Sequence, residues 1–352
     1  MLQQAQQEGS LRLSVPDQAE QWEKAVTPFE KKYQIDVIVE EVPEAELAER
    51  IQTEQDGCID AMMTRGTSTQ ALVEEKLLLG PIEPVLFDKT IQTSIQQDSV
   101  NSVGCLVPVS RYQTGILYDS TQLDLTDWES VEEYLENHVL TVPDPKTSMA
   151  GRGLLQTLVL NLDNSDADYS NVSLAQEIKT VNWQSALEWL EEHWESFVWT
   201  EDELTAIQAV TKGKAAVTVA RSDLVAQIGA ADGDIAFCVP DFQMAAGSES
   251  IGISLRSEHP AAALLLVNWL VTLEGQQALY DARKTIPLCE GVVDGEGTPV
   301  STETDTNATE FLPSVYQESL LKRFQAVIEA VEKRQEAEQD PEQQEQAKEQ
   351  NP

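Results

Sequence analysis

The chain has 352 residues, 41% of them hydrophobic, so it can bury a large core and is long enough for two domains. Its 61 acidic and 23 basic residues give a net charge of −38. That charge argues against nucleic acids and anionic membrane surfaces as partners, because both are bound through basic patches. The longest apolar run, residues 261–271, is too short to span a membrane. The polar start, residues 1–4, lacks the apolar region of a signal peptide, so we expect a cytoplasmic protein or a mature form whose targeting segment is absent.

The first third of the chain alternates short apolar strands with amphipathic helices. Trp22, Val26, Phe29 and Tyr33 lie on one face of the first helix, and Pro28 inside that pattern is expected to kink or split it. This alternation predicts a parallel sheet flanked by helices, an α/β architecture. The predicted strands are 11–15, 35–39 and 58–63, and the other predicted helices are 44–53 and 67–76.

The rest of the chain continues this pattern up to a C-terminal helix. A capping box at residues 200–203 predicts a helix start at Thr200, and Pro260 occupies the first turn of another helix, where proline is tolerated. Residues 291–310 read as a polar loop. The predicted strands are 107–112, 115–118, 139–142, 215–219, 234–239 and 251–255, and the predicted helices start at 126 or cover 183–194, 203–210, 222–228, 261–273, 276–283 and 320–331.

Residues 142–156 form the most informative local pattern. Pro143 and Pro145 end a short strand, and Thr147 or Ser148 can cap the helix that follows. Because the first helical turn is rich in small residues, its backbone N–H groups are expected to stay open to a polar or anionic ligand. An ordinary strand-to-helix connection would have the same sequence.

The four cysteines and three histidines form no recognised catalytic or metal-binding spacing, so we expect no metal and no cofactor. An even number of cysteines permits two disulfides, and buried thiols are an equal alternative. Cys58 and Cys105 are expected in one lobe, where they could bridge, and Cys238 in the other.

Eight segments of the chain, taken in their order, carry a family resemblance. They are 29–37, 58–62, 106–109, 114–118, 128–131, 143–148, 212–217 and 261–279. In this order they resemble the extracellular solute-binding proteins of ABC importers, especially the cluster that binds polyamines, ferric iron, thiamine or phosphonates.

The resemblance implies a two-lobe type II periplasmic-binding-protein fold. Each lobe would be a sheet flanked by helices, and the ligand would bind in the cleft between the lobes. The expected partners are a small-molecule ligand and an ABC importer permease, on the periplasmic or extracellular face of the cell envelope. A lipid anchor before residue 1 is left open. The expected boundaries are 10–111 for lobe 1, 112–247 for lobe 2, 248–335 for the second part of lobe 1 with the C-terminal helix, and 336–352 for a disordered tail.

Two departures bear on the ligand. Iron-binding relatives carry paired tyrosines after the strand at 215–219, where this chain has Arg221, Ser222 and Asp223, so iron is not expected. Polyamine-binding relatives place aromatic residues before the strand at 251–255. This chain keeps the acid there, Glu249, but not the aromatic residue, so polyamine binding stays an alternative.

Arginines near predicted strand ends point to an anionic ligand, whereas Asp223 and Glu249 favour an amine group, so a zwitterion or amino-phosphonate would satisfy both signs. Of ten arginines, Arg65, Arg111, Arg152 and Arg221 lie at expected cleft positions, and guanidinium groups suit carboxylates and phosphates. Pairing of these arginines with surface carboxylates is the ordinary alternative. The expected ligand-binding residues are Thr64, Arg65, Thr67, Ser68, Tyr112, Ser148, Met149, Arg152, Arg221, Ser222, Asp223, Glu249 and Ser250.

Two other function classes use the same fold. An enzyme would need a nucleophile beside a base, and no cysteine has a histidine nearby in the sequence. A receptor or assembly factor without a transport role is the second alternative.

Overall fold

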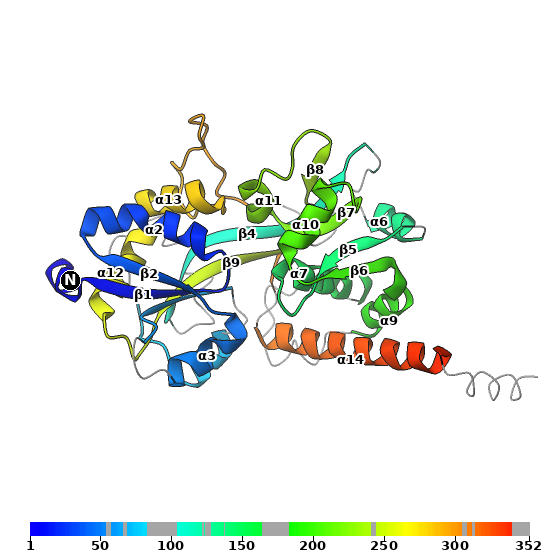
Figure 1. Ribbon diagram of the computed structural model, residues 1–352, viewed down its shortest axis with the longest axis horizontal. Coiled ribbons are helices and arrows are strands. Elements are labelled where there is room, and N and C mark those ends of the chain that lie inside the picture. The colour runs from blue at the N-terminus through cyan, green and yellow to red at the C-terminus, as the bar shows by residue number, and fades with distance from the viewer. Residues whose placement is uncertain are drawn as a thin grey trace, which may run out of the picture. The chain divides into compact units, whose positions relative to one another are not determined.

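The computed structural model divides the chain into two compact units, each of which combines strands and helices (Figure 1). Unit 1 comprises residues 1–114, 221–232 and 246–314, and unit 2 comprises residues 115–220, 233–245 and 315–352. The residues that the structure describes are 1–53, 58–65, 69–82, 104–121, 123, 128–136, 138–163, 183–240, 244–304, 308–311 and 314–339.

The sheet of unit 1 has a parallel part and an antiparallel part. Strands β2 (Asp36–Glu41), β1 (Ser10–Val15) and β3 (Ala61–Thr64) are parallel, as the βαβ alternation predicts. Strand β9 (Met244–Ile253) runs antiparallel to β3, and β4 (Leu106–Asp119) runs antiparallel to β9. Short β10 (Ala308–Glu310) pairs with β9. The carboxyl ends of β1 and β3 therefore meet at one edge of this unit.

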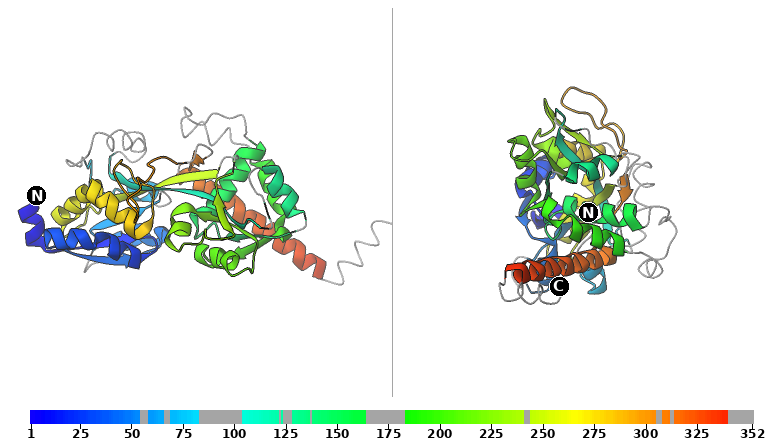
Figure 2. Two further views of the ribbon diagram at one scale, coloured as in Figure 1. Left: turned by 90° about the horizontal axis from the view of Figure 1, so that it is seen from above. Right: turned by 90° about the vertical axis from the view of Figure 1, so that its right-hand side faces the viewer.

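Apolar helix faces cover this sheet. The helices are α1 (Leu2–Glu8), α2 (Ala19–Tyr33), α3 (Glu44–Thr53), α4 (Thr69–Glu74), α11 (Ser222–Gln227), α12 (Pro260–Leu270) and α13 (Leu273–Arg283). Helix α2 packs against α13, and α1 against α12, as Figure 2 shows. Pro28 lies inside α2, which is one helix. Its apolar face packs into the core, where the rings of Phe29 and Trp269 are 5.6 Å apart.

A buried carboxylate fastens the start of α12 to the sheet. Asp60 accepts hydrogen bonds from the backbone N–H of Arg12 at 2.8 Å, from Ser257 Oγ at 2.7 Å and from the backbone N–H of His259 at 2.9 Å. His259 Nδ1 lies 3.0 Å from the other carboxylate oxygen. Pro260 follows at the first helical position, as its sequence position predicts.

Unit 2 contains a second parallel group of strands. Strand β5 (Leu140–Pro143) is parallel to β6 (Phe197–Thr200) and to β7 (Val217–Arg221), and β8 (Ile235–Cys238) is antiparallel to β4. The helices are α6 (Trp128–Leu135), α7 (Met149–Leu158), which continues into a π-helical turn (Val159–Asp163), α9 (Gln184–Glu192), a short 3-10 turn (Trp194–Ser196), α10 (Glu203–Thr211) and α14 (Ser314–Gln339).

The long helix α14 packs against unit 2, although it was expected in lobe 1. The ring of Phe324 lies 5.1 Å from that of Trp199 and 6.1 Å from that of Trp194. Arg334 of α14 forms an ion pair with Glu191 of α9. These contacts between aromatic rings stabilise the packing of α14 on unit 2. The sequence does not predict them, because the paired rings are far apart in the sequence. Figure 1 shows α14 beside α9.

Further stretches of the chain also depart from the expected boundaries. Residues 221–232, expected in lobe 2, belong to unit 1, because α11 packs against α13. Cys58 and Cys105 belong to unit 1 and Cys238 to unit 2. Helix α14 extends to Gln339, inside the expected tail, and residues 340–352 lie outside the described residues.

Several predicted elements also differ from those of the structure. The two strands expected at 107–118 are one strand, β4, with an irregularity in register between Pro108 and Ser110. Strand β9 starts at Met244, seven residues before its predicted start, because its polar part is paired with β4. Asp202, not Thr200, caps α10, since its Oδ1 accepts the Thr205 N–H at 2.7 Å. The expected polar loop includes β10.

Candidate functional site

In unit 1, charged side chains gather where parallel strands end. Asp17 follows β1, Arg65 follows β3, and Arg221 is the last residue of β7. Glu249 lies in the middle of β9, and Arg283 is the last residue of α13. Ligands of open α/β sheets bind at the carboxyl ends of strands, so this edge is the candidate site.

Arg65 connects two carboxylates. Its Nη1 and Nη2 each donate to an oxygen of Asp17 at 2.6 Å, which is a two-pronged geometry. Its Nε donates to Glu249 Oε1 at 2.9 Å. The Arg65 and Glu249 side chains are almost fully buried, whereas the Asp17 side chain is 39% exposed.

Glu249 has a second guanidinium partner. Arg283 donates from Nη1 to Oε2 at 2.7 Å and from Nη2 to Oε1 at 3.0 Å. Ser110 Oγ donates to Oε2 at 2.9 Å. The guanidinium of Arg283 lies over the ring of Trp22, 4.2 Å from its centre, and its Nη2 is 3.4 Å from Gln18 Oε1. Glu249 therefore has its charge balanced from both sides.

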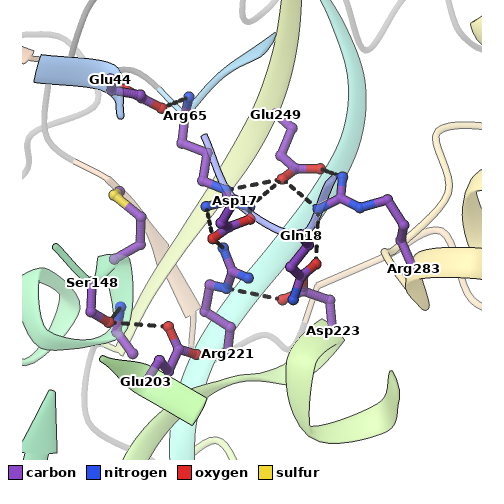
Figure 3. A network of polar contacts seen from close by, with 12 residues as sticks. Asp17, Gln18, Glu44, Arg65, Ser148, Glu203, Arg221, Asp223, Glu249 and Arg283 are labelled. Atoms are coloured by element: carbon purple, nitrogen blue, oxygen red, sulfur yellow. Dashed lines mark hydrogen bonds and ion pairs between the residues drawn. The ribbon is translucent and has the colours of Figure 1, made fainter. Parts of the chain in front are cut away.

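Arg221 extends this pattern in the other direction. Its Nη1 lies 3.8 Å from Asp17 Oδ2, and its Nε lies 3.3 Å from Asp223 Oδ1. Three carboxylates and three guanidiniums thus alternate in one series, as Figure 3 shows. We call this series the acid–arginine chain; its members in order are Asp223, Arg221, Asp17, Arg65, Glu249 and Arg283.

The guanidiniums keep the interior carboxylates ionised. Burial by itself would raise the pKa of Glu249, but Arg283 and Arg65 outweigh it and lower the pKa to about 2. Burial would also raise the pKa of Asp17, and Arg65 and Arg221 hold that pKa well below its usual range. The two carboxylates in turn raise the pKa of Arg65 against the effect of its burial.

An aromatic residue of β4 lies against the acid–arginine chain. Tyr112 is fully buried, and the Arg221 guanidinium carbon is 5.4 Å from the centre of its ring. Tyr112 pairs with Gly247 across the strands, and a side chain at Gly247 would lie 2.7 Å from the phenol oxygen. Glycine at this position thus allows the close approach of the ring. Burial raises the pKa of Tyr112 above its usual range.

The remaining predicted residues of unit 1 have other neighbours. Thr64 Oγ1 donates to Glu44 Oε2 at 3.3 Å, and Ser222 Oγ accepts the Gln113 N–H at 3.3 Å. Ser250 is next to Glu249 in β9, so its side chain points to the opposite face of the sheet. Alternation likewise separates Arg111 from Tyr112. Thr67 and Ser68 lie outside the described residues.

In unit 2, the predicted helix cap is present and is engaged locally. Ser148 caps α7: its Oγ accepts the N–H groups of Ala150 and Gly151, at 3.1 and 3.3 Å, and donates to Glu203 Oε2 at 3.0 Å (Figure 3). The expectation of open N–H groups is therefore wrong for these two residues, because the cap itself satisfies them.

Arg152 stabilises the same connection rather than presenting its charge outward. It is buried, and it donates from Nε to the carbonyl of Pro145 at 2.6 Å and from Nη2 to the carbonyl of Lys146 at 2.8 Å. Its Nη1 lies 3.7 Å from the sulfur of Met149. Arg152 and Met149 thus hold the turn before α7 in place.

The sequence analysis missed Asp17, Gln18 and Arg283. Asp17 had a readable signal, since it follows the carboxyl end of a predicted strand. Arg283 reads in the sequence only as a basic residue in the last turn of a helix, a common position for arginine. Within the described ranges, no group of three or more His, Cys, Asp or Glu residues is placed to hold a metal ion.

The comparisons with known proteins agree with this architecture. The family model for bacterial extracellular solute-binding proteins matches residues 24–309. This chain belongs to that family. The match covers most of the chain and includes every residue of the acid–arginine chain except Asp17.

Solved structures show the same fold. Iron-bound HitA from Pseudomonas aeruginosa aligns with a TM-score of 0.67 and 15% identity over 90% of this chain and 99% of its own. The ferric binding protein from Campylobacter jejuni gives 0.67 and 14% over 90% and 99%. FutA from Trichodesmium, in complex with iron and citrate, gives 0.62 and 17% over 92% and 99%. A comparison with curated protein sequences finds no match.

The expected fold class and family are thus confirmed: the protein has the type II periplasmic-binding-protein fold and is a solute-binding protein. Proteins of this family bind small ligands and function with ABC permeases, so they are transport proteins rather than enzymes. Family membership implies an extracellular or periplasmic location. In the part of the chain that the structure describes, no helix is long and apolar enough to cross a membrane.

Proposed function

We propose that this protein captures a small polar solute at the acid–arginine chain of unit 1 and delivers it to an ABC importer on the outer face of the cell envelope. The observation that carries the proposal is the gathering of six charged side chains around the carboxyl ends of β1, β3 and β7. A buried charged series of this size costs desolvation free energy, which a purely structural core would avoid. Functional sites are where such costs are usually met.

The charge balance of the site favours a zwitterionic or neutral polar solute. Three carboxylates face three guanidiniums, so the site presents no formal excess of positive charge for an anion. Arg65 and Arg221, two of the four arginines on which the expectation of an anion was based, both lie beside carboxylates. The iron named for HitA and FutA is not our proposed solute, because Arg221, Ser222 and Asp223 follow β7 where the resemblance places paired tyrosines.

We further propose that the protein is not an enzyme. Against the effect of burial, the guanidiniums lower the pKa values of the Asp17 and Glu249 carboxylates, so these two groups are poorly suited to act as general bases at neutral pH. Arginine cannot act as a general base because it does not lose its proton in proteins. Binding and release are what these side chains can support.

A thermal-shift screen with a library of small solutes, followed by calorimetry, tests this function. We expect at least one solute to raise the melting temperature and to bind with one-to-one stoichiometry. Arg221→Gln should weaken that binding, and Arg334→Gln, an exposed arginine of unit 2, should not. Equal binding by both variants would place the solute elsewhere, and a library without any binder would contradict a solute-capture function.

A further inference from the structure

One end of the acid–arginine chain is incomplete. Among the residues that the structure describes, Asp17 and Glu249 each lie between two guanidiniums, whereas Asp223 is paired with Arg221 alone. The Asp223 carboxylate is 1% exposed, and neither of its oxygens accepts a hydrogen bond from any residue in the described ranges. The 3.3 Å contact with Arg221 Nε is an ion pair without hydrogen-bond geometry.

The buried Asp223 carboxylate therefore lacks the hydrogen bonds that such a group normally accepts. A carboxylate offers about four acceptor positions, and buried polar groups in native proteins are nearly always satisfied. Gln227, one turn further along α11, donates to the carbonyl of Arg283, and Arg283 itself donates to Glu249. A group that satisfies the Asp223 carboxylate therefore has to donate hydrogen bonds. A positive charge on that group would continue the alternation of carboxylates and cations along the acid–arginine chain.

A second buried polar group belongs to another residue that contacts Arg221. The phenol of Tyr112 has no hydrogen-bond partner among the residues that the structure describes, although the ring is fully buried. Both residues contact Arg221: its Nε lies 3.3 Å from Asp223 Oδ1, and its guanidinium carbon lies 5.4 Å from the centre of the Tyr112 ring. A ligand that carries a donor cation and an acceptor could satisfy both.

We propose that the solute carries a protonated amine, which the carboxylate of Asp223 binds, next to the hydroxyl of Tyr112. This inference rests on the proposed function and assigns the chemical class of its solute. Of the two acids that the sequence favours for an amine, Asp223 and Glu249, Glu249 is already paired with Arg65 and Arg283. Asp223 rather than Glu249 then decides whether an amine binds.

The test is calorimetry with paired probes, each a primary amine and the alcohol of the same carbon skeleton. Suitable pairs are ethanolamine with ethylene glycol, γ-aminobutyrate with γ-hydroxybutyrate, and diaminobutane with butanediol. We expect at least one amine to bind the wild-type protein and its alcohol partner to bind about tenfold more weakly or worse, the range for a hydrogen bond to a charged group. Equal affinity of an amine and its alcohol, or binding by amine-free probes alone, would overturn the inference.

Variants locate the contact. Asp223→Asn keeps the shape and removes the charge, and it should weaken the amine about ten- to hundredfold while the alcohol changes little. Asp232→Asn, an exposed aspartate of the same unit, is the matched control. Circular dichroism verifies that each variant is folded, and Tyr112→Phe gives a second reading if Asp223→Asn unfolds.

The outcomes separate the two proposals. If no amine of the panel binds but an amine-free solute from the library does, the protein still captures a solute and the inference about the amine fails. If Asp223→Asn binds an amine as the wild-type protein does, the carboxylate is not the contact. If no solute binds at all, the proposed function fails as well.

Discussion

Arg283 forms a bidentate ion pair with Glu249, in which Nη1 and Nη2 donate to separate carboxylate oxygens at 2.7 and 3.0 Å. The two residues are 34 positions apart, and both side chains are almost completely buried. Ring contact with Trp22 fixes the guanidinium from the side. This pair anchors one end of the acid–arginine chain, so its loss should disturb the fold as well as the site.

Arg283→Gln should destabilise the protein strongly. The change removes one of two charged partners from a buried carboxylate, and breaking a buried ion pair typically costs about 3–5 kcal/mol of the free energy of unfolding. Urea unfolding followed by circular dichroism measures this loss. Lys32→Gln breaks an exposed pair with Glu274 and should cost less than about 1 kcal/mol. Similar losses in both variants would contradict the buried role of Arg283.

The contribution of Glu249 should depend on pH. Its pKa is lowered in the folded protein, from 4.5 to about 2, so the stabilisation is complete above the unfolded value and is lost as pH falls through the folded value. The difference in free energy of unfolding between the wild-type protein and Glu249→Gln should therefore shrink as the pH falls from about 5 to about 2. Glu23→Gln, on the exposed face of α2, provides the baseline. A difference that grows on acidification would refute the assignment.

Asp60→Asn should loosen the start of α12. The carboxylate receives the N–H groups of Arg12 and His259 and the hydroxyl of Ser257, and an amide cannot accept at both ends. Each buried donor left without a partner costs about 1–3 kcal/mol. We expect reduced stability and faster hydrogen exchange in α12. Asp36→Asn, exposed in β2, is the control and should change neither.

Lowering the pH should weaken the hydrogen bonds of Asp60 at the start of α12 in the wild-type protein. Burial raises the pKa of Asp60, but its bonds with Ser257, Arg12 and His259 outweigh burial and lower the pKa overall. Stabilisation by Asp60 is therefore present above the pKa of the unfolded chain and is lost as pH falls through the lowered value. Exchange in α12 that slows on acidification, after correction for the intrinsic rate, would count against this.

Ser148→Ala should destabilise unit 2 by about 0.5–2 kcal/mol, because it removes the cap of α7 and the hydrogen bond to Glu203. Ser148→Asp should retain the cap but place a second negative charge beside Glu203, so it should not restore full stability. Thermal unfolding compares the two with Ser120→Ala, an exposed serine with a single side-chain hydrogen bond to the Asp234 carbonyl. A Ser148→Ala protein as stable as the wild type would show that the cap contributes little.

Much of the secondary structure follows from local patterns. The period of Trp22, Val26 and Phe29 predicts α2, and Pro260 marks the start of α12, because helix periodicity and caps depend on residues within a few positions. The βαβ alternation predicts the parallel strands of unit 1. Ser148 is recognisable as a cap for the same reason. Boundaries set by pairing, such as the early start of β9, are not encoded so locally.

The chemistry of the site was decided by contacts between distant parts of the sequence. Arg65 meets a carboxylate 48 positions away in Asp17 and another 184 positions away in Glu249. Sequence alone locates both arginine and acid at strand ends, but it cannot say which charges neutralise each other, because that depends on distances of a few ångströms. Only the tertiary structure shows that Glu249 accepts hydrogen bonds from guanidiniums, whereas Asp223 accepts none from the residues that the structure describes. The folding of α11 and α13 around the strand ends determines which donors reach each carboxylate.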